Sequence, residues 1–185
     1  MKLRSHDVTL VGENLTLRPM TEDDWDVLFR WNSDPEVLRY TEGDDVSRYD
    51  PAQVQDIYRT VSQNAYCFMA MFEHRLIGEC WLQEMNLARI LRAHPDKDVR
   101  RIDLMIGEKA HRGRGLGTEM IRLLTAFAFD REHADIVFGC DIADDNIASL
   151  RAFQKAGYKM AARIEQPPGR KARYCFDLTI EPNAA

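Results

Sequence analysis

The sequence predicts an α/β protein in which strands and helices alternate, and three observations carry this prediction. Two apolar runs, 65–72 and 75–85, alternate like strands paired in a hairpin. After residue 108 the apolar spacing changes from two to three or four, which is typical of a strand followed by a helix. A Gly-rich segment, 111–118, lies at that junction.

Length and composition place the chain among ordinary globular proteins. It has 185 residues, of which 45% are hydrophobic and 30% charged, and we expect one domain over residues 1–185. No apolar run approaches the roughly 20 residues of a membrane span, and the first residues lack the apolar stretch of a signal peptide. The expectation is therefore a cytoplasmic protein that does not bind membranes.

The spacing of the cysteines and the net charge limit which metals, disulfides and binding partners the chain can have. The four Cys are widely spaced, and the His residues show no ligand spacing, so we expect no metal site and no disulfide framework. With 25 basic and 30 acidic residues the net charge is -5. This balance argues against nucleic-acid binding and favours a cationic partner.

The first third of the chain contains edge-strand material and two helices. Residues 8–19 alternate around a Gly-Glu-Asn turn, as in edge strands. Thr21 suits the N-cap of a helix, with Asp24 in the third position of a capping box. Asp50-Pro51 begins a second helix, because Asp suits the N-cap and Pro the first turn.

The rest of the chain alternates strands with helices. A polar stretch after residue 85 leads to a strand over 99–108, followed by a long helix. A strand over 135–141 precedes a helix that ends at Gly157, and two strands surround a Pro-Pro-Gly turn. The expected order is β, α, α, β, β, β, α, β, α, β, β.

The Gly-rich junction has the properties of an anion site. Its glycines allow close approach of the backbone to a ligand, and the first free N–H groups of the helix favour negative charge. Arg112 and Arg114 add positive charge, so a pyrophosphate suits the segment. The spacing fits neither a dinucleotide fingerprint nor a Walker motif. A Gly-rich turn with incidental arginines is the alternative.

The junction also resembles a known family motif. Arg112, Gly115 and Gly117 match the Arg/Gln-x-x-Gly-x-Gly/Ala motif of the GNAT acyltransferase superfamily, and the block 146–158 is similar to that family's Asn-led helix. The resemblance covers residues 14–180. It implies a mixed, twisted sheet of about seven strands with about four helices on both faces, splayed where acetyl-CoA enters.

The same resemblance implies where acetyl-CoA binds as cosubstrate. The pyrophosphate lies on the junction, the pantetheine arm pairs with main-chain groups of the preceding strand, and the Asn of the following helix holds the arm. The residues that take these roles by resemblance are Met105, Gly107, Arg112, Arg114, Gly115, Gly117, Thr118 and Asn146.

A closer likeness exists to the bacterial aminoglycoside 6'-N-acetyltransferases. Segments 15–37, 98–108 and 113–124 carry it, together with Asp141 placed five residues before Asn146. It implies direct transfer of acetyl to a primary amine, namely the 6'-amine of an aminoglycoside antibiotic, and hence antibiotic resistance. Siderophore-modifying relatives share part of the pattern. A protein N-terminus, a polyamine or a siderophore hydroxylamine therefore stays open as the acceptor.

Two carboxylates are candidates for the acceptor site. Acetyl transfer to an amine requires the amine to lose a proton, and the resembling enzymes place a carboxylate at Asp141 to bind and deprotonate it. A free Asp has a pKa of about 3.9, so anchoring the ammonium is a second reading. Asp103 lies mid-strand on the face of Met105, where a carboxylate is disfavoured unless it is used. The alternatives are an N-cap, which Asp144 or Asp145 fits better than Asp141, and an ion pair of Asp103 with Arg100 or Arg101.

One departure from the family pattern concerns the general acid. Phe153 stands where many relatives carry a Tyr that protonates the leaving thiolate. A thiolate with a pKa of about 8.5 is a tolerable leaving group, and Tyr158, Tyr174 or water could substitute. The missing hydroxyl also leaves open a coenzyme-binding regulatory module without turnover. The acidic stretches 42–45 and 144–145 could attract a polycation. Both a monomer and a homodimer are compatible with the sequence.

Overall fold

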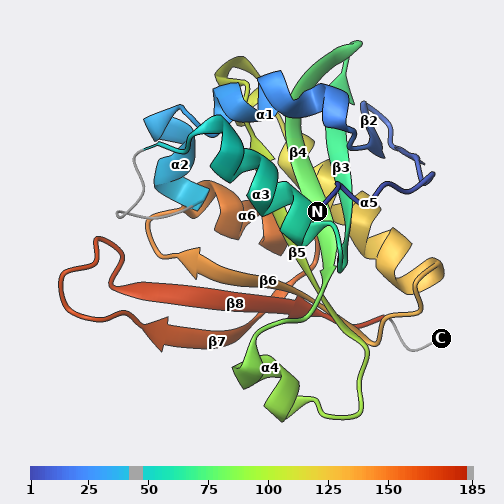
Figure 1. Ribbon diagram of the computed structural model, residues 1–185. Helices are drawn as coiled ribbons and strands as arrows, with labels where there is room; N and C mark the ends of the chain where they lie inside the picture. The colour runs from blue at the N-terminus through green and yellow to red at the C-terminus, as the bar shows by residue number, and fades with distance from the viewer. Residues whose placement is uncertain (42–47, 183–185) are drawn as a thin grey trace.

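The computed structural model (Figure 1) describes residues 1–41 and 48–182. One eight-stranded mixed sheet, in the order β1-β2-β3-β4-β5-β6-β8-β7, runs through it. The strands are β1 (Leu10–Val11), β2 (Leu15–Pro19), β3 (Ala65–Phe72), β4 (Arg75–Glu84), β5 (Val99–Ile106), β6 (Ile136–Ala143), β7 (Lys159–Glu165) and β8 (Tyr174–Ile180).

Six α-helices accompany the sheet in the described part of the chain. They are α1 (Trp25–Trp31), α2 (Pro35–Thr41), α3 (Pro51–Val61), α4 (Ala88–Ala93), α5 (Leu116–Asp130) and α6 (Ile147–Lys155). The α/β class is confirmed, with three elements more than expected. The edge material forms two strands, and α2 and α4 are short helices of seven and six residues that the apolar periodicity did not show.

The local signals at the helix starts are confirmed. The Asp24 carboxylate accepts the Thr21 N–H at 2.8 Å, and the turn Glu22–Asp24 leads directly into α1. Asp50 and Gln53 form a reciprocal capping box before α3. These bonds satisfy N–H groups that a helix cannot pair internally, and they fix where the two helices begin.

Two apolar clusters pack against opposite faces of the sheet. The first contains the buried face of α5 with Phe153 of α6, packed on the central strands. The second contains α1 and α3 with Cys67, Met69 and Met105 from β3 and β5. Helices therefore cover both faces, as predicted.

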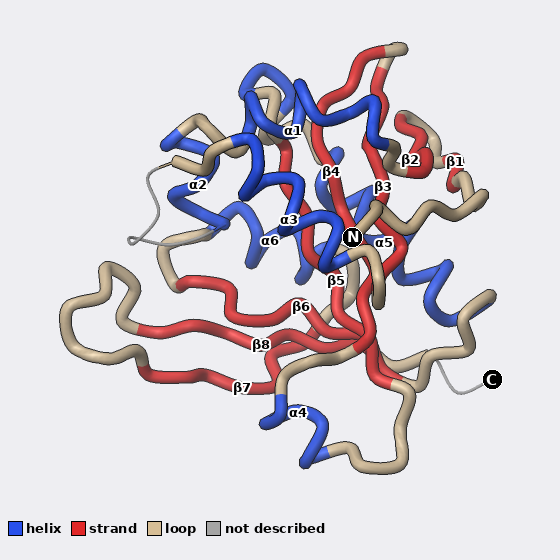
Figure 2. The backbone as a smooth tube through the Cα atoms, viewed as in Figure 1, coloured by secondary structure: helices blue, strands red, loops and turns tan. Residues whose placement is uncertain are grey.

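The sheet opens between β5 and β6. These strands are parallel neighbours over only three residue pairs, from Val99–Ile136 to Arg101–Phe138. Beyond these pairs, β5 continues beside β4 and β6 continues beside β8. Figure 2 shows the two strands running away from each other. The carboxyl half of β5 therefore has an edge that β6 does not cover, which is the predicted splay.

Candidate active site

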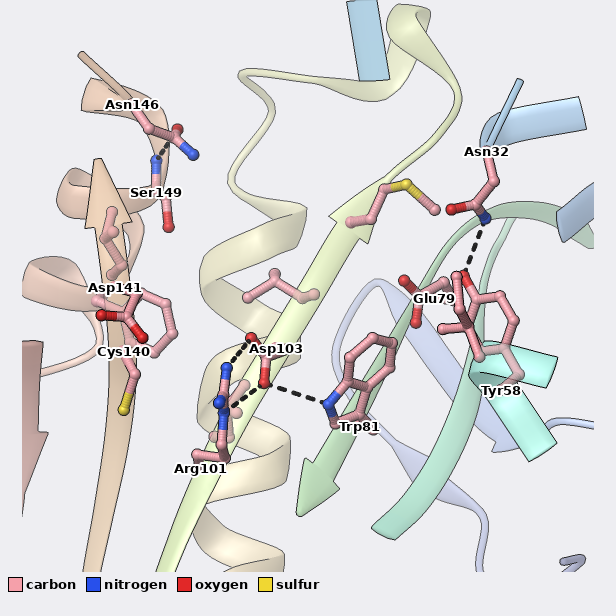
Figure 3. Close-up of a pocket in the computed structure, with 16 residues that line it drawn as sticks. Asn32, Tyr58, Glu79, Trp81, Arg101, Asp103, Cys140, Asp141, Asn146 and Ser149 are labelled. Carbon is pink, nitrogen blue, oxygen red and sulfur yellow. Dashed lines mark hydrogen bonds and ion pairs between the residues drawn. The ribbon is translucent and has the colours of Figure 1, made fainter. Parts of the chain in front are cut away.

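A cavity of about 300 Å³ lies at the opening between β5 and β6. It takes side chains from the end of α1 and from α3 on one side and from α6 on the other. Figure 3 shows three carboxylates in series across it, with Asp141 on the β6 side, Asp103 on β5 and Glu79 on β4. The lining also includes Asn32, Ile57, Tyr58, Trp81, Arg101, Ile102, Leu104, Met105, Cys140, Ile142, Asn146, Ser149 and Phe153.

The Gly-rich junction has the geometry of an anion site. Gly113 and Gly115 adopt φ of 74° and 85°, and no heavy atom would lie within 4 Å of a Cβ at either position. Gly115 is the N-cap of α5, so the free N–H groups of a 15-residue helix begin there. At Gly117 a Cβ would lie 3.6 Å from Leu104 and Ile106, which shows how closely α5 packs on β5. These features fit a phosphate group.

The two arginines of the junction are engaged with the protein. Arg112 donates from Nε to the Ile106 carbonyl at 3.0 Å and pairs with Glu36 of α2 at 3.2 Å. The Arg114 guanidinium lies 4.8 Å from the centre of the Phe72 ring. Arg112 thus ties the junction to β5 and α2. The backbone amides, rather than these side chains, have the geometry of the anion site.

The direction in which the main-chain N–H and C=O groups of β5 point decides which of them a pantetheine arm could pair with. A side chain at Gly78 of β4 would collide with the Met105 carbonyl oxygen, so this oxygen faces β4. Main-chain groups alternate in direction along an antiparallel strand, which turns those of Leu104 and Ile106 toward the open edge. A side chain at Gly107 would collide with the Trp31 indole, so this glycine is needed for packing.

Thr118 and Asn146 lie in the first turn of α5 and at the start of α6. Thr118 is buried under the junction. Asn146 is the N-cap of α6, and its Oδ1 accepts the Ser149 N–H at 3.2 Å. The alternative reading, in which Asp144 or Asp145 caps this helix, does not hold, because the N-cap is Asn146. The Asp144 carboxylate instead accepts the Tyr174 N–H at 3.1 Å.

Asp103 lines the cavity and forms an ion pair at the same time. Both its oxygens accept from Arg101 at 2.8 Å, and the Trp81 indole N–H donates to Oδ2 at 3.2 Å. Burial opposes the charge of Arg101, but Asp103 keeps the pKa of this guanidinium above its ordinary value. The ion pair expected as the alternative reading therefore coexists with a place in the cavity wall.

Asp141 occupies an irregular position in β6. The register between β6 and β8 shifts between Gly139 and Ile142, and Asp141 adopts a φ of 53°. Left-handed backbone is uncommon for residues other than Gly, so the surroundings must hold it. The side chain is 45% exposed and accepts from Arg89 of α4 at 2.7 Å. This bulge turns the carboxylate toward the cavity.

Asp177 of β8 holds Asp141 in place, a role that the sequence did not suggest. Its side chain is 3% exposed and accepts the Asp141 N–H at 3.0 Å. It also binds Arg89 through two bonds of 3.1 and 2.9 Å. The hydrogen bond to Asp177 raises the pKa of Arg89, and the Asp141 charge adds to this effect. One guanidinium therefore bridges a buried and an exposed carboxylate.

Glu79 and Tyr58 form a second group that the sequence analysis missed. Both are nearly fully buried and line the cavity. The Tyr58 hydroxyl accepts from Asn32 Nδ2 at 3.0 Å, and burial, together with the Glu79 charge, raises the pKa of Tyr58. The sequence did contain a signal for Glu79, because it is an acidic residue inside an apolar strand. The same reasoning drew attention to Asp103.

The structure also places the aromatic residues considered for the general acid. Phe153 lines the cavity and packs under Gly139, where a side chain would collide with its ring. The Tyr158 hydroxyl is hydrogen-bonded to Thr125 at 2.7 Å in the core, and burial raises its pKa. Tyr174 stacks with Arg163, 4.3 Å from the ring centre to the guanidinium. Neither tyrosine lines the cavity.

Three further expectations concern the acidic stretch 42–45, a metal site and a membrane span. The acidic stretch 42–45 lies outside the described residues. Within 1–41 and 48–182, no group of three or more His, Cys, Asp and Glu side chains is arranged to hold a metal ion. No helix in the described part of the chain is long and apolar enough to cross a membrane.

The cavity, the splayed strands and the anion site define an acyltransferase of the GNAT type. The family model described as "Acetyltransferase (GNAT) domain" matches residues 14–159, and the chain belongs to this family. The model describes an acetyltransferase domain, so the chain is an acetyltransferase.

The most similar proteins include aminoglycoside-modifying enzymes. The chain is 25% identical over 176 residues to aminoglycoside N(6')-acetyltransferase type 1 of Klebsiella pneumoniae, covering 88% of this chain and 82% of that protein. It is 26% identical over 171 residues to an N-acetyltransferase 9-like protein of Nematostella vectensis, with coverage of 89% and 84%. The solved structure of aminoglycoside acetyltransferase AAC(6')-Ib in complex with coenzyme A superposes with a TM-score of 0.69 at 24% identity, covering 90% and 94%.

Proposed function

We propose that this acetyltransferase transfers acetyl directly from acetyl-CoA to the 6'-amine of an aminoglycoside, which makes it an antibiotic-resistance enzyme. The observation that carries the proposal is the cavity beside the anion site, because three carboxylates stand in its wall. A cleft of one charge sign concentrates ligands of the opposite sign, and aminoglycosides carry several ammonium groups. The similarity to aminoglycoside 6'-N-acetyltransferases supports the same acceptor.

The junction and the open edge of β5 are the proposed coenzyme site. Amides from Gly115 to Thr118 would bind the pyrophosphate, and Asn146 would hold the pantetheine arm from α6. The predicted main-chain role of Met105 passes to Leu104 and to the Ile106 N–H, which face the open edge, while the Ile106 carbonyl accepts from Arg112. An amide on that edge would polarise the thioester carbonyl.

Asp141 and Asp103 are the proposed acceptor residues. Asp141 is the more exposed of the two, and Arg89 already binds one of its oxygens, so it is suited to anchor an ammonium at the mouth of the cavity. Asp103, held by Arg101 and Trp81, presents a fixed acceptor deeper inside. The described Cys residues are not placed as nucleophiles, since burial raises the pKa of the one thiol in the wall, Cys140.

Phe153 is the observation that favours a second candidate function. A GNAT domain without a tyrosine at this position could bind acetyl-CoA as a regulatory module without turnover. An acceptor other than an aminoglycoside, such as a protein N-terminus, a polyamine or a hydroxylamine, remains the alternative within catalysis. The proposal also includes a single domain over residues 1–185 and a cytoplasmic monomer or homodimer.

Mass spectrometry of reaction products tests the proposal. The purified protein is incubated with acetyl-CoA and kanamycin or tobramycin, in parallel with polyamines, peptides and hydroxylamines. An aminoglycoside heavier by one acetyl group, with fragmentation that locates the group on the 6'-nitrogen, is the expected product. Acetylation of another panel amine alone would replace the acceptor. Acetyl-CoA binding without any product would favour the regulatory module.

A further inference from the structure

The ion pair of Asp177 with Arg89 is costly for the fold. The Asp177 side chain is 3% exposed, and the next residue of β8, Leu178, belongs to the apolar core. Taking a carboxylate and its partner out of water costs free energy, and apolar residues of similar size are often as stabilising or more so. Stability alone therefore gives no reason for this charged pair beside the cavity.

Arg89, in the first turn of α4, binds Asp177 in a fixed orientation. Its Nε donates to Oδ2 at 3.1 Å and its Nη2 to Oδ1 at 2.9 Å. Two parallel bonds between a guanidinium and a carboxylate fix the plane of both groups. The same Nη2 donates to Asp141 Oδ1 at 2.7 Å. The buried carboxylate thus aims Arg89 at Asp141.

The main chain of Asp141 is held by the same pair. Its N–H donates to Asp177 Oδ1 at 3.0 Å, and its φ is 53°. A residue other than Gly keeps such a backbone conformation only where its surroundings impose it. Asp177 therefore fixes where Asp141 stands in β6, and Arg89 fixes how its carboxylate is turned.

One oxygen of Asp141 is left for a ligand. Arg89 occupies Oδ1, and within residues 1–41 and 48–182 no group forms a hydrogen bond with Oδ2. Asp141 lines the cavity and its side chain is 45% exposed. Asp103 differs, because both its oxygens already accept from Arg101. Oδ2 of Asp141 is therefore an exposed acceptor for a cation that enters the cavity.

Ammonium and guanidinium groups make different demands on a carboxylate. An ammonium is a compact charge that can bind a single oxygen. A guanidinium is a planar fork that gains most when it donates to both oxygens at once. With Arg89 on Oδ1, a second guanidinium would share that oxygen with a group of the same charge. An ammonium on Oδ2 needs no such sharing.

We propose that Arg89 is a positioning residue that sets the specificity of the acceptor site. By holding Oδ1 of Asp141, it leaves a place for an ammonium and disfavours a guanidinium. The inference rests on the proposed function only in taking Asp141 as the anchor of the acceptor. It narrows the acceptor to compounds whose anchored group is an alkylammonium, as in an amino sugar or a polyamine, and rejects an arginine-like group at that position.

Calorimetric titration with two matched cations tests the proposal. Benzylamine and benzylguanidine carry the same ring and one positive charge each. They are titrated into the protein in the presence of coenzyme A, which has no acetyl group to transfer. The wild type should bind benzylguanidine at least about fivefold more weakly than benzylamine, because the guanidinium loses one of its two hydrogen bonds.

The double variant Arg89→Met/Asp177→Asn removes the cation together with its buried partner, so no buried charge is left unpaired. Both oxygens of Asp141 are then free, and benzylguanidine should bind at least as tightly as benzylamine. Arg89→Lys is the second variant. Its ammonium has a shorter reach, so it can pair with Asp177 without reaching Asp141, and the preference for benzylamine should shrink.

Arg18→Met/Asp24→Asn is the matched control. It makes the same two substitutions in another pair that is joined by two bonds and contains a buried Asp, with side chains that are 29% and 4% exposed. It should keep the wild-type ratio of the two Kd values.

A wild type that binds both compounds equally, prefers benzylguanidine or binds neither would overturn the inference. A folded Arg89 variant that keeps the wild-type ratio, or a control that loses it, would do the same. Because the readout is binding, it is independent of turnover. If no aminoglycoside is acetylated, the proposed acceptor fails, while the ratio of the two Kd values still decides the role of Arg89.

Discussion

The coenzyme side and the acceptor side of the cavity are built in different ways. The coenzyme side comes from one stretch of chain, the end of β5 with the junction and the first turn of α5, and it presents backbone amides. The acceptor side collects Glu79, Asp103 and Asp141 from three strands, and arginines hold Asp103 and Asp141. A local motif can define the first side. Long-range contacts define the second, so the acceptor can change while the coenzyme site stays the same.

The largest expected effect concerns the support of the acceptor side. Asp177→Asn removes a buried charge that holds Arg89 and the Asp141 N–H. Breaking a buried ion pair costs about 3 kcal/mol of unfolding free energy. Urea denaturation measures this loss. The acceptor KM should rise more than kcat falls, and the Kd of acetyl-CoA should not change.

Asp135→Asn is the control for that variant. Asp135 likewise pairs with a cation, Lys97, and accepts a backbone N–H, but its side chain is 40% exposed. Its loss should lower the free energy of unfolding less than Asp177→Asn does, because solvent screens an exposed ion pair. Equal losses in both variants would mean that burial does not distinguish Asp177.

The second prediction tests the coenzyme side. Gly115→Ala forces a side chain into left-handed backbone and places a methyl group at the anion site, where space is now open. The Kd of acetyl-CoA should rise about tenfold, given a conformational cost of 1–2 kcal/mol. Isothermal titration calorimetry measures it. Gly169→Ala has a similar φ of 97° and open surroundings in the β7–β8 turn, so it should lower stability without affecting the Kd.

A third variant probes the acceptor side without changing its charge. Trp81→Phe keeps an aromatic ring but removes the N–H that donates to Asp103. One hydrogen bond contributes about 1 kcal/mol, so kcat/KM for the acceptor should fall about fivefold. A parallel rise in the Kd of acetyl-CoA would contradict the separation of the two sides.

The smallest effect is one of pH on stability, away from both sides. Burial lowers the pKa of His6 below 6.5, although its hydrogen bond with the Cys67 carbonyl opposes this. Between pH 6.5 and the lowered pKa of folded His6, the unfolded chain therefore binds more protons than the folded one. The contribution of neutral His6 to the free energy of unfolding is complete above pH 6.5 and is lost as the pH falls through this range. The Tm of the wild type should decline between neutral pH and about pH 5 more than that of His6→Gln. Identical declines would exclude His6.

Sequence reasoning succeeded where signals are local. The hairpin of β3 and β4, the start of α3 at Asp50-Pro51 and the glycines of the junction each depend on a few neighbouring residues, and the structure confirms these elements. The carboxylates Asp103 and Asp141 were also found, and the structure brings both to one cavity. Their roles stay predictions.

The missed features depend on contacts between distant segments. Helix α4 is six residues long and two of these are arginines, so its apolar periodicity gave no signal. Arg89 was therefore not connected with Asp141, 52 residues away. Glu79 was read as part of an apolar strand. The N-cap bond that the Asn146 side chain forms in α6 was also missed, and its role toward the coenzyme stays a prediction.

The most direct test of the two-sided account is a paired measurement on Asp141→Asn, comparing the Kd of acetyl-CoA with kcat/KM for the acetylated amine. We expect an unchanged Kd and a kcat/KM lower by about 100-fold, because only the acceptor loses its anchor. Full activity would remove Asp141 from the site. A Kd that weakens by the same factor as kcat/KM would show that coenzyme and acceptor share one site and would contradict the account.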